Sequence, residues 1–412
     1  MHIRKFTPRL AAADVDKALA TFPVVVIRGP RQSGKSTLAK QLAAAEERSL
    51  FTFDDFRTRQ AFRADEDAFL QSAKRMVLDE VQREPGVMLA LKRAVDAMET
   101  AREPGRYLVT GSANLATMHQ VADALTGRAA FVTLWPLTRR ERLGLTLAGR
   151  WSAFLDAPSS EWPEIAKADT APAADWRTEC AVGGFPVPAL HLRDTEERDH
   201  WHRQYFESFL ERDLRDLSKI DEVVDFRRLM QAAALRVGGL LNHTEIGRDV
   251  GLKQQRARSY LNLLETAYQA IRVPAYAVNR GKRLIKSAKL YWIDPALALR
   301  VAQETEPRGA HFENLVLLDL LAWAESRGDR PQICHWHTSD QYEVDFVVET
   351  AQRLLPVEVK TSRSLSTKDL KGLRIFLDEH PHKAAGGLVL YDGDDVFWMG
   401  ANILAVPWWK VI

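Results

Sequence analysis

The segment GPRQSGKST, residues 29 to 37, restricts the fold of this 412-residue chain more than any other feature. Gly29, four intervening residues and then Gly34-Lys35-Ser36 have the full spacing of a phosphate-binding loop. An apolar run, VVVI, precedes the loop, and a stretch with helical spacing follows it. A strand should therefore lead into the loop and a helix should leave it. The loop amides and the helix N-terminus would then face one point, which suits a triphosphate.

The side chains of this loop match the chemistry of a nucleotide with Mg²⁺. Glycine lets the backbone turn tightly and approach the phosphates. Lys35 would reach the β- and γ-phosphates and act in catalysis, while the hydroxyl of Ser36 would be a Mg²⁺ ligand. The expected nucleotide-binding residues in this segment are Gly29, Pro30, Arg31, Gln32, Ser33, Gly34, Lys35, Ser36 and Thr37.

A second acidic element follows at RMVLDEVQR, where three apolar residues run directly into Asp79 and Glu80. Asp79 would hold Mg²⁺ through water and contribute to the nucleotide site. Glu80 would orient or deprotonate the attacking water, because in-line attack on the γ-phosphate needs a polarised nucleophile. Taken alone, an apolar run that ends in acidic residues also describes an ordinary strand entering a turn. The phosphate-loop pattern upstream favours the catalytic interpretation.

Two further segments would complete this site. A third expected strand, residues 106 to 110, leads into Gly-Ser-Ala-Asn, so that Ser112 or Asn114 would sense the γ-phosphate. Arg128 precedes a fourth expected strand, residues 130 to 134, and is a candidate arginine finger in its own chain or across a subunit boundary. An ordinary surface arginine is an equal alternative. A finger acting across a boundary would require a homo-oligomer.

Length and composition limit the class of protein. A chain of 412 residues can hold two to four domains, and 46% apolar with 27% charged residues is typical of a soluble globular protein. Two cysteines, Cys180 and Cys334, suggest neither a disulfide framework nor a cysteine-rich zinc site. The sequence shows no apolar run of transmembrane length and no signal-peptide core at its start. We therefore expect a cytoplasmic protein without membrane partners.

A shift in composition marks one boundary. Residues 156 to 175 are rich in Ala, Pro, Ser and Asp and have weak apolar periodicity, which predicts a long loop or linker. The expected division is a phosphate-loop domain at 1–150, a linker and helical extension at 151–224, a winged helix-turn-helix at 225–300 and a small α/β domain at 301–412.

Residues 225 to 300 concentrate positive charge. They contain 14 lysines and arginines against 5 acidic residues, whereas the net charge of the whole chain is only +2. Their pattern predicts a helix at 226–237, a short helix at 244–250, a turn at Gly251, a helix at 254–266 and two strands around residues 279 to 282. This order is the outline of a winged helix-turn-helix.

The third of these helices would present polar and basic side chains outward while Ala257, Tyr260, Leu261 and Leu264 pack inward. That is the arrangement a groove-reading helix needs, and a basic hairpin beyond it could touch phosphates. The alternative is a winged helix used only for protein packing, because a fold does not fix a function. The expected DNA-binding residues are Lys253, Arg256, Arg258, Arg280, Lys282 and Arg283.

A second set of charged residues lies in the last hundred positions. Glu313 falls in a helical stretch, Asp345 in an expected strand, and Glu358 and Lys360 on one face of the next. Converging carboxylates would bind Mg²⁺, and Lys360 would orient the nucleophile or stabilise developing charge. The pattern resembles the PD-(D/E)XK nuclease core, with Glu313, Asp345 and Glu358 as metal ligands and Glu358 and Lys360 in catalysis. Acids on half-exposed strands, or an inherited nuclease fold that no longer cuts, are the alternatives.

Several motifs occur together in one order along the chain: PVVVIRGPRQSGKST, FTFDD, VLDEVQR, LVTGSANL, LTGR, GGFP, FLERD and EVDF followed by VEVK. In this order they resemble the prokaryotic AAA+-superfamily ATPases that have a C-terminal domain of unknown function. The resemblance covers nearly all 412 residues. It implies an ATP-binding domain, with Lys35, Ser36, Asp79 and Glu80 in nucleotide roles and ATP and Mg²⁺ as cofactors. Thr126 in LTGR and Phe185 in GGFP differ from the usual Ala and Tyr.

Two functions are consistent with these patterns. The first is an ATPase that couples ATP turnover to DNA binding or processing, with metal-dependent nuclease activity in the C-terminal domain. The second is a regulatory ATPase switch that acts on a protein partner, with the nuclease-like domain as a non-cutting scaffold. Stimulation of ATP hydrolysis by DNA would distinguish the first from the second.

Overall fold

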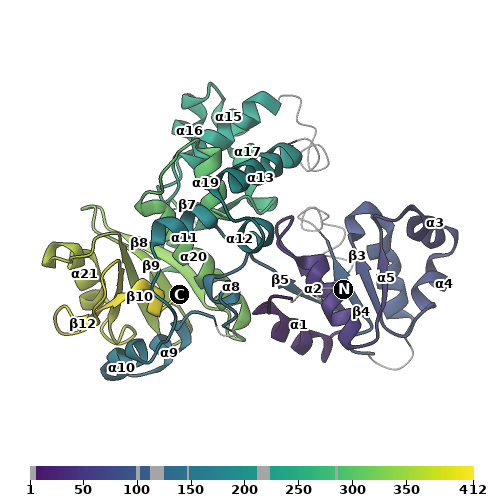
Figure 1. Ribbon diagram of the computed structural model, residues 1–412, viewed down its shortest axis with the longest axis horizontal. Coiled ribbons are helices and arrows are strands. Elements are labelled where there is room, and N and C mark those ends of the chain that lie inside the picture. The colour runs from purple at the N-terminus through teal and green to yellow at the C-terminus, as the bar shows by residue number, and fades with distance from the viewer. Residues whose placement is uncertain (1–5, 99–102, 112–124, 146–147, 211–222, 284–285) are drawn as a thin grey trace.

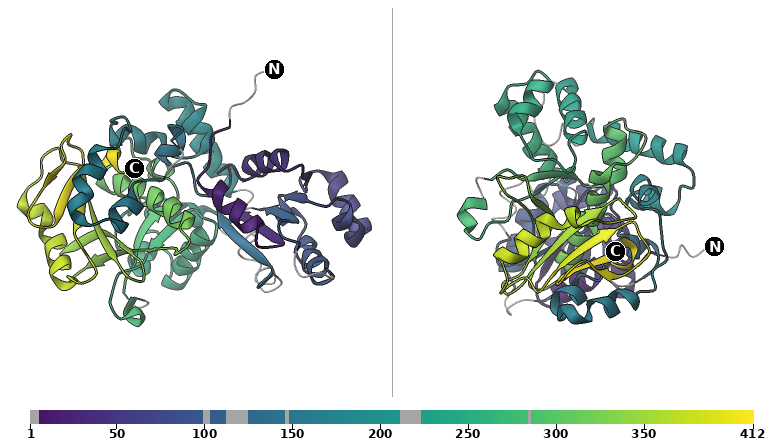
Figure 2. Two further views of the ribbon diagram at one scale, coloured as in Figure 1. Left: turned by 90° about the horizontal axis from the view of Figure 1, so that it is seen from below. Right: turned by 90° about the vertical axis from the view of Figure 1, so that its left-hand side faces the viewer.

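The computed structural model describes residues 6–98, 103–111, 125–145, 148–210, 223–283 and 286–412. The chain forms an N-terminal α/β part, a helical part and a C-terminal α/β part, which occupy three corners of the molecule (Figure 1). Seen from below, the N-terminal and C-terminal parts lie at opposite ends (Figure 2). Within the described residues, no helix is long and apolar enough to cross a membrane.

The N-terminal part is built on a five-stranded sheet in which every pair of neighbouring strands is parallel. The strand order is β2-β3-β4-β1-β5. Helices cover both faces, so the central strands β1, β3 and β4 are largely apolar and their alternate side chains enter two separate cores. The strands are β1 (Val24–Arg28), β2 (Ser49–Thr52), β3 (Met76–Asp79), β4 (Tyr107–Thr110) and β5 (Ala129–Thr133). This confirms the α/β fold that the strand, loop and helix pattern predicts, and the structure shows in addition that the sheet is parallel.

The helices of this part divide between the two faces. One core places β1, β3 and β4 against α3, α4 and α5, and the other places β1 against α1 and α2. The bounds are α1 (Ala11–Leu19), α2 (Lys35–Ala45), α3 (Phe56–Ala64), α4 (Glu66–Gln71), η1 (Val81–Arg83) and α5 (Gly86–Asp96). Because all the strands are parallel, their carboxyl ends share one edge, where the loop after β1 and the acids after β3 meet.

Residues 156 to 175 are not a simple linker, and this prediction was wrong for their central part. They contain η2 (Ser159–Glu161) and α10 (Trp162–Lys167). Trp162 is fully buried beside Phe154, with ring centroids 5.8 Å apart, in the core shared with the C-terminal sheet. One buried tryptophan can anchor so short a helix although it produces no apolar periodicity.

The other helices between β5 and the helical part are short, except for α13. They are α8 (Arg139–Arg142), α9 (Trp151–Asp156), α11 (Trp176–Val182), α12 (Pro186–Leu190) and α13 (Thr195–Ser208). Residues 211 to 222, which include the last three residues of the FLERD motif, lie outside the described residues.

The helical part follows the predicted helices closely and departs from the predicted strands. Its elements are α15 (Val223–Ala234), α16 (His243–Asp249), α17 (Gln254–Thr266), β6 (Ala270–Val273), α18 (Arg280–Arg283), β7 (Lys289–Trp292) and α19 (Pro295–Val301). Strands β6 and β7 pair in antiparallel fashion, but residues 280 to 283 form a helical turn between them rather than the tip of a tight hairpin. The winged-helix assignment remains a prediction.

The C-terminal part is a mixed six-stranded sheet of order β12-β13-β11-β10-β9-β8. Helix α20 packs on one face, with Phe312 and Val316 in its core, and α21 packs on the other through Leu373 and Phe376. The bounds are α20 (Gly309–Ser326), β8 (Gln332–His337), β9 (Glu343–Glu349), β10 (Leu354–Lys360), η4 (Thr367–Leu370), α21 (Lys371–Glu379), β11 (Gly387–Tyr391), β12 (Phe397–Trp398), β13 (Ile403–Pro407) and η5 (Trp408–Lys410).

Candidate functional site

The loop between β1 and α2 has the geometry that the phosphate-loop pattern predicts. Gly29 has φ +138° and Gly34 has φ +99°, which side chains other than glycine rarely adopt. A Cβ at Gly29 would lie 2.4 Å from the carbonyl oxygen of Leu134, where β5 ends. The loop therefore passes so close to the neighbouring strand that only glycine fits at its first position.

Lys35 lies inside this loop. Its side chain is buried, and Nζ donates hydrogen bonds to the carbonyl oxygens of Gly29 (3.1 Å) and Pro30 (2.7 Å). The ammonium is thus held at the first turn of α2, where the partial positive charge of the helix N-terminus also acts. Such a concentration of positive charge can hold the phosphates of a nucleotide.

Asp79 is the centre of a hydrogen-bond cluster at the carboxyl edge of the sheet. The hydroxyl of Ser36 donates to Oδ1 of Asp79 over 2.8 Å, and the hydroxyl of Thr110 donates to the same oxygen. The backbone N–H of Glu80 donates to Oγ1 of Thr110 over 3.3 Å. The phosphate loop, β3 and β4 are joined in this way around one buried carboxylate.

Oxygen atoms of this kind suit Mg²⁺. Ser36 and Asp79 supply a hydroxyl and a carboxylate, and Mg²⁺ usually binds one or two such protein groups together with phosphate oxygens and water. Among the described residues, no group of three or more His, Cys, Asp and Glu side chains is arranged to hold a metal. Ser36 and Asp79 would therefore need the phosphate oxygens of a nucleotide and water to complete the coordination of Mg²⁺.

Glu80 adopts a strained backbone conformation directly after this cluster. Its φ of +59° lies in the left-handed region, and its carboxylate accepts a hydrogen bond from the side-chain amide of Gln82. Strain of this kind persists where the surrounding structure imposes it, as at many active sites. The catalytic role of Glu80 remains a prediction that this geometry allows.

Most of the other residues predicted to bind nucleotide lie close to the phosphate loop. Pro30, Arg31, Gln32, Ser33 and Thr37 all lie in the loop or the first turn of α2. Ser33 is buried. Ser112 and Asn114 lie outside the described residues.

Thr110 was missed as a site residue by sequence reasoning. The signal was its position at the end of β4, directly beside the acidic end of β3.

Arg128 cannot be an arginine finger within its own chain. It precedes Ala129, which pairs with Val24 at the start of β1, whereas the phosphate loop follows Arg28 at the other end of that strand. Arg128 also forms an ion pair with Asp96 at the end of α5. The prediction for the same chain was wrong because parallel strands place residues before a strand and after it at opposite edges. A role across a subunit boundary remains a prediction.

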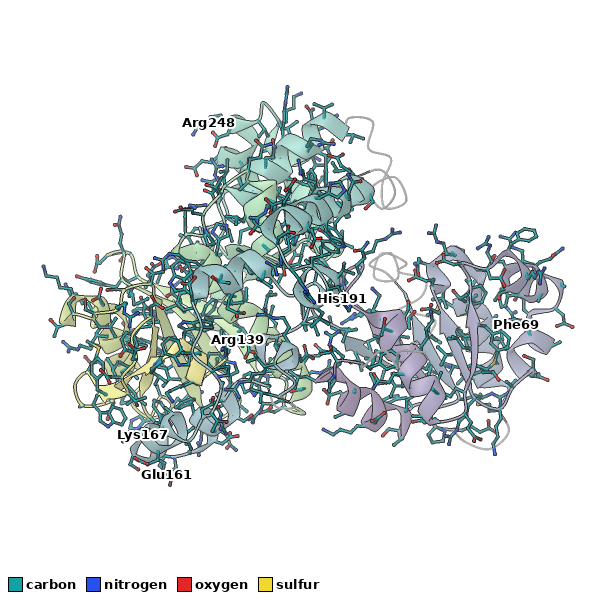
Figure 3. All side chains as sticks on the ribbon, viewed as in Figure 1. Phe69, Arg139, Glu161, Lys167, His191 and Arg248 are labelled. Atoms are coloured by element: carbon teal, nitrogen blue, oxygen red, sulfur yellow. The ribbon has the colours of Figure 1, made fainter. Side chains whose placement is uncertain are left out.

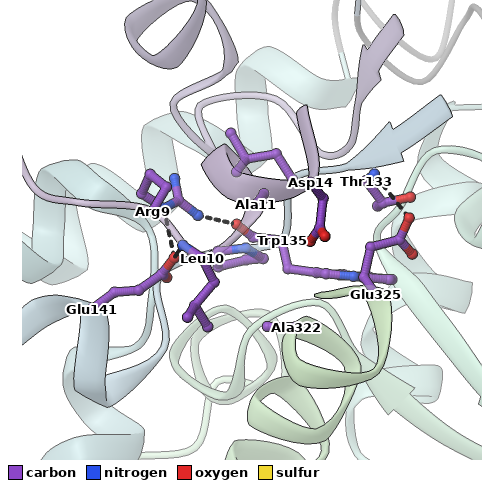
Figure 4. Close-up of a pocket in the computed structure, with 11 residues that line it drawn as sticks. Arg9, Leu10, Ala11, Asp14, Thr133, Trp135, Glu141, Ala322 and Glu325 are labelled. Carbon is purple, nitrogen blue, oxygen red and sulfur yellow. Dashed lines mark hydrogen bonds and ion pairs between the residues drawn. The ribbon is translucent and has the colours of Figure 1, made fainter. Parts of the chain in front are cut away.

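A buried arginine that the sequence did not single out fixes the back of the phosphate loop. Arg9 donates from Nη1 to the carbonyl oxygen of Ser33 (2.7 Å) and from Nη2 to that of Trp135 (2.6 Å). Its Nε donates to Oε1 of Glu141 over 3.1 Å, and the N–H of Leu10 donates to the same oxygen over 2.7 Å (Figure 4). These bonds connect the loop to the segment that leaves β5.

The GGFP turn joins that segment to the helical part. The N–H of Leu137 donates to the carbonyl oxygen of Gly184 over 2.7 Å, and the N–H of Gly184 donates to Oδ2 of Asp294 over 2.6 Å. A Cβ at Gly34 would lie 3.8 Å from Cγ of Pro186, in the same turn. The phosphate loop is therefore a neighbour of the GGFP turn, and this turn is hydrogen-bonded to Asp294 directly before α19.

The predicted DNA-binding side chains do not form one surface. Lys253 and Arg258 are exposed at α17, and Arg256 lies 3.8 Å from Asp225. Arg283 is only 8% exposed and forms a two-pronged ion pair with Glu349 of β9, so its assignment to DNA was wrong. The side chains of Arg280 and Lys282 lie outside the described residues.

The predicted residues of the C-terminal part converge. Asp345 accepts a hydrogen bond from the N–H of Val359 on β10 (2.9 Å), beside Glu358. Nζ of Lys360 donates to Oε1 of Glu358 over 2.7 Å. Burial and the nearby Asp345 raise the pKa of Glu313 to about 8, and the same two causes raise the pKa of Glu358 well above its ordinary value.

An unpredicted cation lies among these carboxylates. Nζ of Lys289, on β7 of the helical part, is 3.2 Å from Oδ1 of Asp345 and 3.7 Å from Oε2 of Glu313. Burial alone would lower the pKa of Lys289, but Asp345, Glu313 and Glu343 outweigh it and raise the pKa. The assignment of Glu313, Asp345 and Glu358 to a metal remains a prediction, and this lysine stands against it.

Comparisons with known proteins divide the chain into three matched segments. Residues 21–143 match the AAA domain family, residues 173–308 match a domain of unknown function, DUF8612, and residues 308–411 match another, DUF4143. Uncharacterized proteins of Mycobacterium bovis and Mycobacterium tuberculosis are each 29% identical over 410 residues, covering 97% of this chain and 83% of the relative.

Solved structures with some likeness include a Walker-type ATPase of Pyrococcus abyssi, with 16% identity and a TM-score of 0.44. That match covers 73% of this chain and 98% of the other. AMPPCP-bound DnaA of Aquifex aeolicus is 14% identical over 62% of this chain and 87% of its own, with a TM-score of 0.27. The AAA match contains both the phosphate loop and Asp79. The chain therefore combines a segment that matches the AAA domain family with a C-terminal segment that matches DUF4143.

Proposed function

We propose that this protein binds ATP with Mg²⁺, hydrolyses the γ-phosphate and couples this turnover to DNA binding by the helical part. The observation that carries the hydrolysis step is the cluster of Ser36, Asp79 and Thr110 beside the phosphate loop. It brings a hydroxyl and a carboxylate, which are ligand types that Mg²⁺ prefers, to the loop that holds Lys35, with Glu80 next in the chain.

Each group would have a separate role in hydrolysis. The loop amides and Lys35 would bind and neutralise the phosphates, and Ser36 and Asp79 would hold Mg²⁺ between them and the nucleotide. Glu80 would orient the attacking water as a general base. The carboxylate of Glu80 accepts a hydrogen bond from Gln82, and a change at the nucleotide would break or keep this bond.

The case for DNA rests on the exposed side of α17. Lys253, Gln254, Gln255 and Arg258 are exposed, whereas Ala257, Tyr260, Leu261 and Leu264 are buried. Arg248 of α16 projects from the outer end of the same part (Figure 3). Exposed lysine and arginine next to amide side chains favour phosphate contacts and base contacts on one helix.

Contacts between the parts offer a path for coupling. Arg9 connects the phosphate loop to Trp135 and Glu141, and the GGFP turn connects the next residues to Asp294 before α19. A change in the loop on hydrolysis would therefore act on segments that contact the helical part. A coupling of this kind requires that the two nucleotide states favour different arrangements of these contacts.

The first experiment is steady-state ATP hydrolysis with no DNA, single-stranded DNA and duplex DNA, at low and moderate salt, with Lys35→Ala as the blank. We expect stimulation by DNA that weakens as salt rises, since phosphate contacts release counterions. Lys253→Ala and Arg258→Ala should each lower the salt dependence of DNA affinity by about one phosphate contact. Arg203→Ala is the matched control, because Arg203 is exposed on α13 outside this surface. A hydrolysis rate that does not respond to added DNA, together with a DNA affinity that Lys253→Ala and Arg258→Ala leave unchanged, would contradict the DNA proposal.

The same experiment addresses a second candidate, a nucleotide-dependent switch that acts on a protein partner. It is favoured because much of the positive charge of the helical part is used internally. Arg227 pairs with Glu207, Arg236 with Asp249, and Arg300 with Asp199. ATP hydrolysis that is abolished by Lys35→Ala but indifferent to DNA would support the switch.

The remaining expectations belong to this proposal. We propose a cytoplasmic protein divided at 1–150, 151–224, 225–300 and 301–412. A homo-oligomer follows if Arg128 acts on a neighbouring nucleotide. Mixing Lys35→Ala with Arg128→Ala subunits should then restore part of the activity.

A further inference from the structure

The carboxylates of the C-terminal sheet surround a cation that the protein itself supplies. Nζ of Lys289 lies 3.2 Å from Asp345, 3.5 Å from Glu343 and 3.7 Å from Glu313, measured to the nearest carboxylate oxygens. The side chain of Lys289 is 5% exposed, as is that of Asp345. An ammonium from β7 therefore lies where carboxylates from α20 and β9 meet.

Four carboxylate oxygens of this cluster already accept hydrogen bonds from groups of the protein. Oδ1 of Asp345 accepts from Lys289, and its Oδ2 accepts from the N–H of Val359 over 2.9 Å. Oε2 of Glu313 accepts from the hydroxyl of Tyr291 over 2.7 Å. Lys360 pairs with Oε1 of Glu358, which leaves Oε2 of Glu358 as the buried oxygen of this set with no hydrogen-bond partner in the described structure.

The backbone holds Lys289 in this position from two sides. Strand β7 pairs with β6 on one side, where Lys289 opposes Val273, and with Leu240 on the other. The turn before Leu240 packs against α20, since a Cβ at Gly238 would lie 2.8 Å from Cβ of Ala310 and 3.4 Å from Oε2 of Glu313. The backbone of Lys289 is therefore fixed beside α20, within reach of Glu313.

We infer that Lys289 occupies the cation position of this carboxylate cluster, so that the cluster joins the helical part to the C-terminal part and does not bind a divalent metal. A metal ion at the same carboxylates would lie within a few ångströms of the ammonium, and this repulsion is large in a buried site. The nuclease-like residues would then serve as a structural contact. This inference goes beyond the proposed ATP and DNA functions and does not depend on them.

The test is binding of Mn²⁺ to the nucleotide-free full chain, followed by electron paramagnetic resonance. Asp345→Asn should bind Mn²⁺ as the parent protein does, because the parent protein should bind no Mn²⁺ at this cluster. Lys289→Met keeps the length of the side chain without its charge, and should raise Mn²⁺ affinity about tenfold or more. The double variant Lys289→Met with Asp345→Asn should lose that gain. Lys289→Arg is the matched control, because it keeps a cation in the cluster.

Two results would overturn the inference. One is Mn²⁺ binding by the parent that Asp345→Asn or Glu358→Gln abolishes, and the other is a folded Lys289→Met protein that gains no Mn²⁺ affinity. If Lys289→Met does not fold, the comparison of the parent with Asp345→Asn and Glu358→Gln decides alone. ATP hydrolysis and its response to DNA should be measured on the same samples, because their failure would reject the proposed function and leave the cation assignment standing.

Discussion

Replacing Arg9 by alanine should destabilise the protein and weaken nucleotide binding at the same time. Its side chain is 7% exposed and its partner Glu141 is 4% exposed, so the pair is almost fully removed from water. Breaking a buried pair by deleting one partner costs about 3–5 kcal/mol. Glu141 keeps the N–H groups of Leu10 (2.7 Å) and Thr138 (2.9 Å) as donors, which places the expected loss near the lower end of this range.

The assay is the free energy of unfolding from urea titrations of Arg9→Ala, Glu141→Ala and the double variant. Each single variant leaves one buried charge without its partner, whereas the double variant leaves neither charge. The sum of the two single losses should therefore exceed the double loss by about 1.5 kcal/mol or more, within the usual range for residues in contact. Arg93→Ala is the matched control. Arg93 pairs with Glu66 at the surface, where the two side chains are 55% and 38% exposed, and should lose less than about 1 kcal/mol.

Nucleotide affinity provides the second readout for Arg9. The guanidinium holds the carbonyl oxygen of Ser33, so its removal frees the back of the phosphate loop. We expect fluorescent ATP analogues to bind Arg9→Ala about tenfold more weakly, which corresponds to about 1.4 kcal/mol. Single losses that add within about 0.5 kcal/mol would refute the idea that the pair acts as a unit. Unchanged nucleotide affinity would refute its role in holding the loop.

Three other substitutions test separate parts of the structure. Gly29→Ala should abolish binding of fluorescent ATP because its Cβ would lie 2.4 Å from the oxygen of Leu134, whereas Gly251→Ala, with an open surrounding, should only lose about 1 kcal/mol of stability. Burial raises the pKa of Asp319 from 3.8 to about 6, so the folded state binds its proton more tightly and stability falls as pH rises through that interval. Asp319→Asn should remove this dependence and be more stable at pH 7 by up to about 3 kcal/mol in urea titrations; an equal pH slope would contradict the assignment. Thr110→Val should slow ATP hydrolysis by about tenfold or more at saturating ATP while the protein stays folded, and an unchanged rate would exclude Thr110 from the site.

The sequence alone was sufficient to predict those structural features that depend on residues close together along the chain. The strand, loop and helix around Lys35 follow from local spacing, and the apolar run that ends at Asp79 becomes β3. The helix predicted at 254–266 matches α17, because its apolar side chains recur at helical spacing on a buried face. These features use backbone periodicity and turn chemistry, which are properties of short segments.

Only the tertiary structure decided which distant residues meet. Arg9 and Glu141 are separated by 132 positions, and Lys289 and Asp345 by 56, so no periodicity relates them. Arg128 was placed at the wrong edge of the sheet because parallel pairing with β1, and not its sequence context, sets its position. Such contacts depend on strand order, on register and on how helices pack between the parts. The same helices and strands could be arranged in several folds, and each fold would bring different distant residues together.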